Sequence, residues 1–213
     1  MPMEQEPTPS QDDLHREAMA LVRGLRLMEL AGEVGEAHLV GSVPLKLIVK
    51  PDIDLHVLVE EESPPKPDGA EVEAALTLAR GLMERAAVRK MELMRFLFRD
   101  AVKIGFDAGG ERGWHVDLWL TTDPEHLGTE PTRWVQERLT PELRRAILTL
   151  KRYYAERDMC RFGMSRELYR AVIEHGVRTP RQFLDYARTH QLSYDNILEM
   201  LEEDAKTWDP DHD

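Results

Sequence analysis

Residues 41–54 have the sequence Gly41-Ser42-Val43-Pro44-Leu45-Lys46-Leu47-Ile48-Val49-Lys50-Pro51-Asp52-Ile53-Asp54. This stretch places a Gly-Ser turn ahead of two carboxylates that one apolar residue separates. In an extended strand the side chains at positions i and i+2 point the same way, so Asp52 and Asp54 share one face and Ile53 points to the other. Paired carboxylates are costly there unless a cation joins them. The stretch therefore predicts a phosphate-binding turn followed by a metal-binding strand.

The composition limits the class of protein. The chain has 213 residues, 42% hydrophobic and 32% charged, which is typical of a soluble globular protein with one large or two small domains. The formal net charge of -12 argues against sequence-independent binding to nucleic acid, because Lys and Arg supply that affinity. This charge does not exclude a local basic groove. The single cysteine, Cys160, cannot form an internal disulfide. No apolar run approaches the roughly 18 residues that span a bilayer. We expect a cytoplasmic protein without a membrane segment.

The apolar spacing divides the chain into a mixed α/β half and an all-helical half. It predicts helices over 13–30 and 70–88, and strands over 37–40, 52–59, 92–98, 101–106 and 114–120. Ser42 as a cap and Pro44 in the first turn predict a further short helix over 43–49. From Pro131 onward it predicts helices only, beginning near Thr140, Ser165, Thr179 and Ser193. We expect a disordered lead-in at 1–12, an α/β domain at 13–130, a helical domain at 131–207 and a tail at 208–213. The expected fold class is α+β.

A third carboxylate, Asp117, lies on the last predicted strand. Alternation puts it on one face with His115 and Trp119, and the apolar residues between them on the other. If this strand neighbours that of Asp52 and Asp54, three carboxylates converge. Hard oxygen ligands at this density suit Mg²⁺ or Mn²⁺, and two ions roughly 3.5–4 Å apart support an in-line phosphoryl displacement. The Gly-Ser turn, at the start of a helix, would supply N–H groups for a nucleotide's phosphates.

These residues resemble the DNA polymerase β-type nucleotidyltransferase superfamily. The resemblance rests on the Gly-Ser pair, the Asp-x-Asp about ten residues later, and Val116-Asp117-Leu118. It implies a small mixed β-sheet flanked by helices, in which Asp52 and Asp54 bind both metal ions and Asp117 helps to ligate the catalytic ion and deprotonates the acceptor hydroxyl. Residues 41–54 also resemble the GrpB-like branch. That branch often lacks the first Asp, so the presence of Asp52 favours an active metal site.

The helical half is similar to the helical domain that follows the catalytic domain in archaeal CCA-adding enzymes and oligoadenylate synthetases. The matching segments are 150–154, 161–165, 167–169, 173–176 and 183–184. The resemblance implies that Lys151 touches the triphosphate. Two departures from that pattern matter: Cys160 replaces the family's phosphate-binding tyrosine, and the sequence ends where those enzymes carry further RNA-binding domains. The first departure argues against triphosphate binding through position 160, and the second makes tRNA a less favoured acceptor.

Together these features predict a nucleotidyltransferase that moves a nucleoside monophosphate from a nucleoside triphosphate to an acceptor hydroxyl and releases pyrophosphate. The phosphate-binding candidates are Gly41, Ser42, Lys50 and Lys151. The acidic charge favours a small molecule or a protein over RNA as acceptor, and the oligomeric state is open. The competing class is a non-catalytic nucleotide-binding or regulatory protein, such as the partner subunit of a toxin system, on the same fold.

Several polar residues near the predicted carboxylates allow two interpretations each. Arg95, Arg99 and Lys103 could form a basic strip beside the site, but we favour a solvated sheet face. His115 could touch substrate, although a partly exposed polar filler is the interpretation we favour. Trp119 could stack a nucleotide base.

Overall fold

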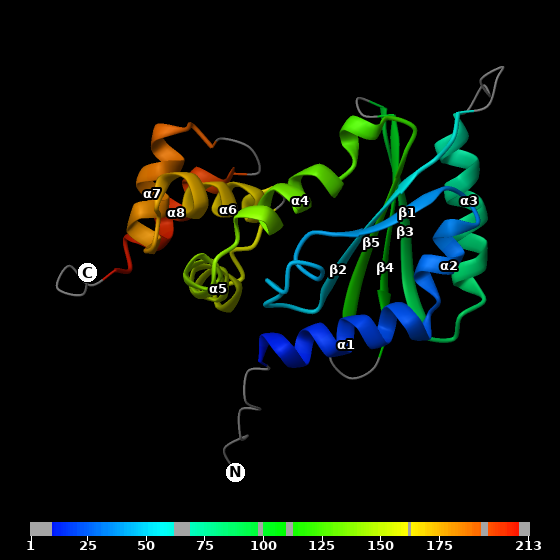
Figure 1. The fold of residues 1–213 in the computed structure, drawn as a ribbon, viewed down its shortest axis with the longest axis horizontal. Helices are drawn as coiled ribbons and strands as arrows, with labels where there is room; N and C mark the ends of the chain where they lie inside the picture. The colour runs from blue at the N-terminus through cyan, green and yellow to red at the C-terminus, as the bar shows by residue number, and fades with distance from the viewer. Residues whose placement is uncertain are drawn as a thin grey trace, which may run out of the picture. The chain divides into compact units, whose positions relative to one another are not determined.

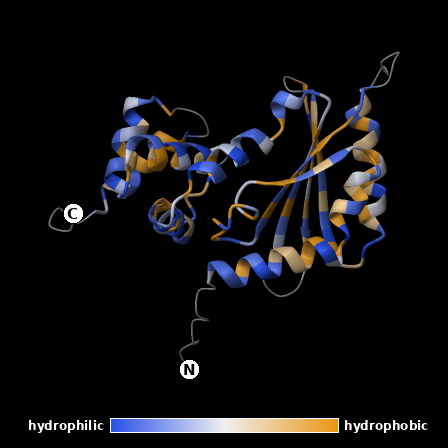
Figure 2. Cartoon of the chain, in the orientation of Figure 1, coloured by the Kyte–Doolittle hydropathy of each residue, from blue (hydrophilic) through white to orange (hydrophobic). Residues whose placement is uncertain are grey.

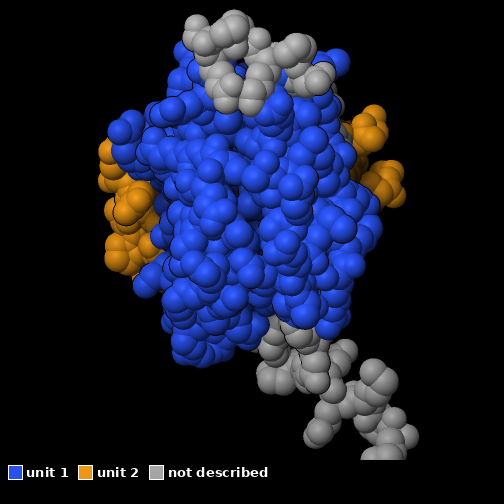
Figure 3. All heavy atoms as spheres, turned by 90° about the vertical axis from the view of Figure 1, so that its right-hand side faces the viewer, with its two compact units in different colours: residues 1–134 blue, residues 135–213 orange. Residues whose placement is uncertain are grey.

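The computed structural model describes residues 10–61, 69–97, 100–109, 113–161, 163–192 and 196–208. The chain divides into two compact units, Met1–Trp134 and Val135–Asp213 (Figure 3). Unit 1 contains a β-sheet with helices, and the described elements of unit 2 are helices. Most of the predicted lead-in and tail, residues 1–9 and 209–213, lies outside the described residues. The α+β fold class is confirmed.

Unit 1 is built on a mixed sheet, in which the described strands have the order β1-β2-β5-β4-β3. Its strands are β1 (Glu36–Val40), β2 (Asp52–Leu58), β3 (Val88–Phe96), β4 (Ala101–Ala108) and β5 (Trp114–Thr121) (Figure 1). β2 and β5 run parallel, and the other neighbours are antiparallel. Hydrophilic and hydrophobic residues alternate along these strands (Figure 2), so one face of the sheet is apolar and the other polar.

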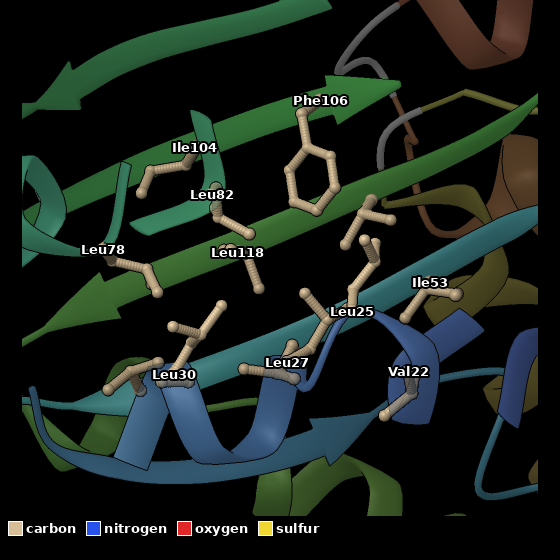
Figure 4. Packing of buried hydrophobic residues seen from close by; sticks show 14 of the residues in the cluster. Val22, Leu25, Leu27, Leu30, Ile53, Leu78, Leu82, Ile104, Phe106 and Leu118 are labelled. Atoms are coloured by element: carbon tan, nitrogen blue, oxygen red, sulfur yellow. The ribbon is translucent and has the colours of Figure 1, made fainter. Parts of the chain in front are cut away.

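The apolar face of the sheet packs against three helices, α1 (Gln11–Gly24), α2 (Leu27–Gly32) and α3 (Ala70–Met83). Leucines of α2 and α3 meet strand residues in one cluster, which includes Leu30, Leu78, Leu82, Ile53, Ile104, Phe106 and Leu118 (Figure 4). Ile53 and Leu118 are fully buried there. Because strand side chains alternate, burial of Ile53 directs Asp52 and Asp54 to the opposite face of the sheet.

The predicted helix over 43–49 is wrong. Residues 41–46 form consecutive turns, in which the Lys46 N–H donates to the Val43 carbonyl at 3.0 Å and the Leu47 N–H to the Ser42 carbonyl at 2.8 Å. Lys46 takes a left-handed backbone conformation with φ of 52°, and this conformation ends any right-handed helix. The Gly-Ser pair therefore does not begin a helix, so no helix dipole points at it.

Other boundaries differ from the prediction for local reasons. The predicted helix over 13–30 is two helices, because Arg26 has φ of 54° and breaks the chain direction between α1 and α2. The predicted helix over 70–88 ends at Met83, since Val88 already pairs with Ala108 in the sheet. α4 (Thr129–Arg138) was not predicted, because Val135 is its only buried residue and leaves no apolar stripe.

The described part of unit 2 contains the end of α4, followed by α5 (Pro141–Glu156), α6 (Met164–His175), α7 (Pro180–Thr189) and α8 (Ile197–Ala205). The predicted caps are present at two starts: the Thr140 hydroxyl accepts from the Leu143 N–H, and Thr179 forms a capping box with Gln182. Ser193, the predicted start of the last helix, lies outside the described residues. No helix in the described ranges combines the length and apolar character needed to cross a bilayer.

Candidate active site

The pairing of β2 with β5 brings the predicted carboxylates together. In this parallel register Asp54 lies directly beside Asp117, and Asp52 lies beside His115. Neighbouring strands are about 4.8 Å apart and residues in register point to the same face. Asp52, Asp54 and Asp117 therefore lie on one face of two adjacent strands.

The Asp117 carboxylate has a cation on each oxygen. Oδ1 lies 2.9 Å from His115 Nε2, and Oδ2 lies 2.7 Å from Lys103 Nζ. The Asp117 side chain is 17% exposed. Burial acts to raise the pKa of this carboxyl, but the hydrogen bonds and charges of His115 and Lys103 outweigh burial and hold the pKa below its ordinary value. Asp117 is therefore ionised at neutral pH, as a metal ligand must be.

His115 joins two carboxylates. Its Nε2 meets Asp117, and its Nδ1 lies 2.9 Å from Oδ1 of Asp107 on β4. The hydrogen bond to Asp117 is the main cause that raises the pKa of His115 to about 9, against the opposing effect of partial burial. The side chain is half exposed, as a surface filler would be, but the sequence-based interpretation overlooked these two carboxylate contacts. His115 is an imidazolium at neutral pH.

The burial and the contacts of Lys103 were also not predicted from the sequence. The interpretation as a solvated side chain is wrong, because Lys103 is only 16% exposed and its ammonium lies 5.6 Å from the centre of the Trp119 ring. Even spacing was the available signal, since Lys103, Gly105 and Asp107 share one face of β4. Arg95 does not extend a basic strip, because it reaches Glu71 of α3 behind the sheet, 3.5 Å away. Arg99 lies outside the described residues.

Two glycines lie against the carboxylates. A Cβ atom at Gly41 would lie 3.0 Å from Oδ2 of Asp54, and one at Gly105 would lie 3.3 Å from Oδ1 of Asp117. The Gly41 N–H donates to the Thr132 hydroxyl of α4 at 3.0 Å. That hydroxyl in turn donates to the Gly128 carbonyl at 2.7 Å, so the Gly-Ser turn is tied to the start of α4.

The donor chemistry of the site fits a divalent cation. In the described parts of the chain, no group of three or more His, Cys, Asp or Glu side chains is already arranged to hold a metal ion. The carboxylates are instead close to cations of their own chain, including Lys50, whose Nζ lies 3.2 Å from Oδ2 of Asp52. Carboxylate oxygens from adjacent strands, with glycine rather than a side chain beside Asp54, suit Mg²⁺ or Mn²⁺. Asp52, Asp54 and Asp117 are the residues that would hold such ions.

The predicted phosphate-binding residues belong to different units. Gly41, Ser42 and Lys50 lie in unit 1, where the Lys50 side chain is 51% exposed. Lys151 belongs to α5 of unit 2, where it is 7% exposed and its Nζ donates to the Tyr169 hydroxyl at 2.9 Å. Gly41, Ser42 and Lys50 are therefore close in sequence to Asp52 and Asp54. Lys151 instead has a hydrogen-bond partner, Tyr169, inside its own unit.

The fold is similar to three solved structures. A cytoplasmic RNA terminal U-transferase matches with a TM-score of 0.54 at 18% identity over 78% of this chain and 47% of its own. Terminal uridylyl transferase 4 from Trypanosoma brucei with bound UPU matches with a TM-score of 0.51 at 12% identity, over 94% of this chain and 76% of its own. The STING-associated CdnE c-di-GMP synthase from Capnocytophaga granulosa matches with a TM-score of 0.51 at 15% identity, over 90% of this chain and 78% of its own. The chain spans about half the length of the first of these structures.

Sequence comparisons add no closer relationship, because no protein-family model and no curated protein matches the chain. The three structural neighbours are members of the polymerase β nucleotidyltransferase superfamily. The chain therefore shares the fold of these three enzymes, as the sequence resemblance implied, with a helical C-terminal half.

Proposed function

We propose that the protein is a metal-dependent nucleotidyltransferase that moves a nucleoside monophosphate from a nucleoside triphosphate to an acceptor hydroxyl. One observation carries the proposal: Asp54 and Asp117 lie side by side on parallel strands, with Asp52 on the same face. The shared fold supports it, since a terminal uridylyl transferase and a c-di-GMP synthase have the same architecture at low sequence identity. Carboxylates that are partly buried are paired with cations or coordinate metal ions.

In this proposal Asp52, Asp54 and Asp117 hold two Mg²⁺ or Mn²⁺ ions. When bound, the ions would neutralise the charge that develops on the phosphate oxygens of the leaving pyrophosphate. The acceptor oxygen forms a bond to the α-phosphorus while the bond between the α-phosphorus and the bridging oxygen breaks. Asp117, which is ionised at neutral pH, takes the proton of the acceptor hydroxyl on a carboxylate oxygen.

The proposed substrates rest on the candidate phosphate contacts and on the net charge of the chain. Gly41, Ser42, Lys50 and Lys151 are the proposed contacts of the triphosphate. The net charge of -12 favours a small molecule or a protein side chain over RNA as the acceptor, because it would repel a polyanion. A cytoplasmic location suits a nucleoside triphosphate substrate and a chain with a single cysteine.

A second function has its own support. Lys103, His115 and Lys50 already neutralise carboxylates of the site. With their charge balanced by these three side chains, the carboxylates do not require a metal ion. Such a site would suit a regulatory protein that binds nucleotides without turnover. The alternative is therefore a non-catalytic nucleotide-binding protein on the same fold.

The two functions differ in pyrophosphate release: the enzyme releases it after binding a nucleoside triphosphate, and the non-catalytic protein does not. We would incubate the protein with each nucleoside triphosphate and Mg²⁺, add small-molecule, protein or RNA fractions as acceptors, and measure pyrophosphate release beside calorimetric binding. Asp54→Asn and Asp117→Asn should abolish release, whereas Glu92→Gln on exposed β3 should not. Binding that survives both variants, with no pyrophosphate from any fraction, would establish the non-catalytic alternative.

A further inference from the structure

The carboxylate proposed to bind the catalytic metal already holds a cation from its own chain. Lys103 Nζ lies 2.7 Å from Oδ2 of Asp117, and both side chains are largely buried, with 16% and 17% exposed. His115 Nε2 is 2.9 Å from the other oxygen. A divalent ion approaching Asp117 therefore meets two positive charges, of which Lys103 is the permanent one.

The strands are built to let Lys103 reach Asp117. In the register of β4 with β5, Lys103 lies opposite Trp119, and the residue opposite Asp117 is Gly105. Lys103 therefore extends diagonally along the sheet. A Cβ atom at Gly105 would lie 3.6 Å from Cε of Lys103 and 3.3 Å from Oδ1 of Asp117. The absence of a side chain at Gly105 leaves the path of the lysine clear.

We infer that Lys103 is a built-in counter-cation that competes with the divalent metal for Asp117 and so sets the affinity of the site for metal. This inference rests on the proposed function, because it takes Asp54 and Asp117 as metal ligands. Moving a largely buried ammonium away from its carboxylate is costly unless another anion receives it. The triphosphate is such an anion. Metal alone therefore binds weakly, and metal together with a nucleoside triphosphate binds better.

The test is binding of Mn²⁺ alone, measured by calorimetry and by the paramagnetic resonance signal of free Mn²⁺. We compare the wild type with Lys103→Met, which keeps the aliphatic stem and removes the charge. Mn²⁺ affinity should rise at least about tenfold, the low end of the effect that a charge within ~4–6 Å has on proton binding to a carboxylate. Lys103→Arg keeps the charge and should match the wild type.

Lys90→Met is the matched control. Lys90 lies on the same sheet face but pairs with Glu92 at 2.7 Å on exposed β3, so its removal should leave Mn²⁺ affinity unchanged. Circular dichroism and thermal unfolding establish that each variant is folded, and Lys103→Gln replaces the Met variant if that one does not fold. The nucleotide should enhance Mn²⁺ binding less in the Lys103→Met variant than in the wild type.

The outcomes separate this inference from the proposed function. Mn²⁺ binding that is lost in Asp54→Asn but equal in wild type and Lys103→Met overturns the inference and leaves the metal site standing. If neither wild type nor Lys103→Met binds Mn²⁺, with or without a nucleoside triphosphate, the metal site itself fails and the inference fails with it. Tighter binding in Lys103→Met alone supports the inference.

Discussion

Gly41 lies against the carboxylate of Asp54: a Cβ atom at this glycine would be 3.0 Å from Oδ2, and its φ of +70° is left-handed. Gly41→Ala should therefore both strain the backbone and displace the proposed metal ligand. We expect a loss of about 1–2 kcal/mol in the free energy of unfolding, from the left-handed conformation alone. Urea denaturation measures this loss, and pyrophosphate release should fall further than stability does.

Gly24→Ala is the matched control for that change. Gly24 is the last residue of α1, and a Cβ atom there meets nothing within 4 Å. This variant should be as stable as the wild type or more stable by roughly 0.5–1 kcal/mol, because alanine is the better helix residue. Equal behaviour of the two variants would mean that Gly41 has no special part in the site.

The faces of the strands could be predicted from the sequence, and their partners could not. Alternation of Ile53, Leu55 and Val57 placed the carboxylates of β2 on the polar face, because burial of an apolar residue every second position leaves no other arrangement. The pairing of β2 with β5, which are far apart in the chain, depends on tertiary packing, and only the resemblance to a superfamily pointed to it.

The contacts of Lys103 depend on both register and a neighbouring glycine, so local sequence reasoning missed them. A lysine on a strand is usually exposed, and its reach toward Asp117 requires that Gly105 lie opposite that residue. The wrong helix over 43–49 has a similar origin. Ser42 as a cap and Pro44 in the first turn indicated a helix, but Lys46 adopts a left-handed conformation that helix propensities do not predict.

The Lys103–Asp117 pair should be strongly coupled in stability. We expect a double-mutant cycle of Lys103→Met and Asp117→Asn to give a coupling free energy of about 1–3 kcal/mol, because the pair is close and largely buried. Urea denaturation of the four proteins without divalent metal provides the measurement. The exposed pair of Lys90 and Glu92, at 2.7 Å, is the reference and should show no measurable coupling. Equal coupling in both cycles would contradict the importance of burial.

A substitution at Lys151 tests whether this lysine binds the nucleotide or stabilises unit 2. If its ammonium contacts the triphosphate, Lys151→Met should raise the KM for the nucleoside triphosphate about tenfold, as expected for loss of a charged hydrogen bond. Tyr169→Phe removes only the hydroxyl that accepts from Lys151 at 2.9 Å, so its KM should stay close to wild type. A Lys151→Met variant that loses stability at unchanged KM would assign the residue to the core of unit 2. Steady-state kinetics and thermal unfolding of both variants decide between these roles.

The metal-free protein should lose stability as the pH rises from 6.5 to above 9. The hydrogen bond to Asp117 is the main reason why the pKa of His115 rises from 6.5 to about 9, so the folded state binds this proton more tightly than the unfolded state. Its contribution is complete below pH 6.5 and disappears as the pH passes 9. The side chain is nearly half exposed, which reduces the expected loss to about 1 kcal/mol. Urea denaturation in EDTA at several pH values should show this loss in the wild type, a smaller one in Asp107→Asn, and none in His115→Gln; an identical slope in His115→Gln would rule the imidazole out as its source.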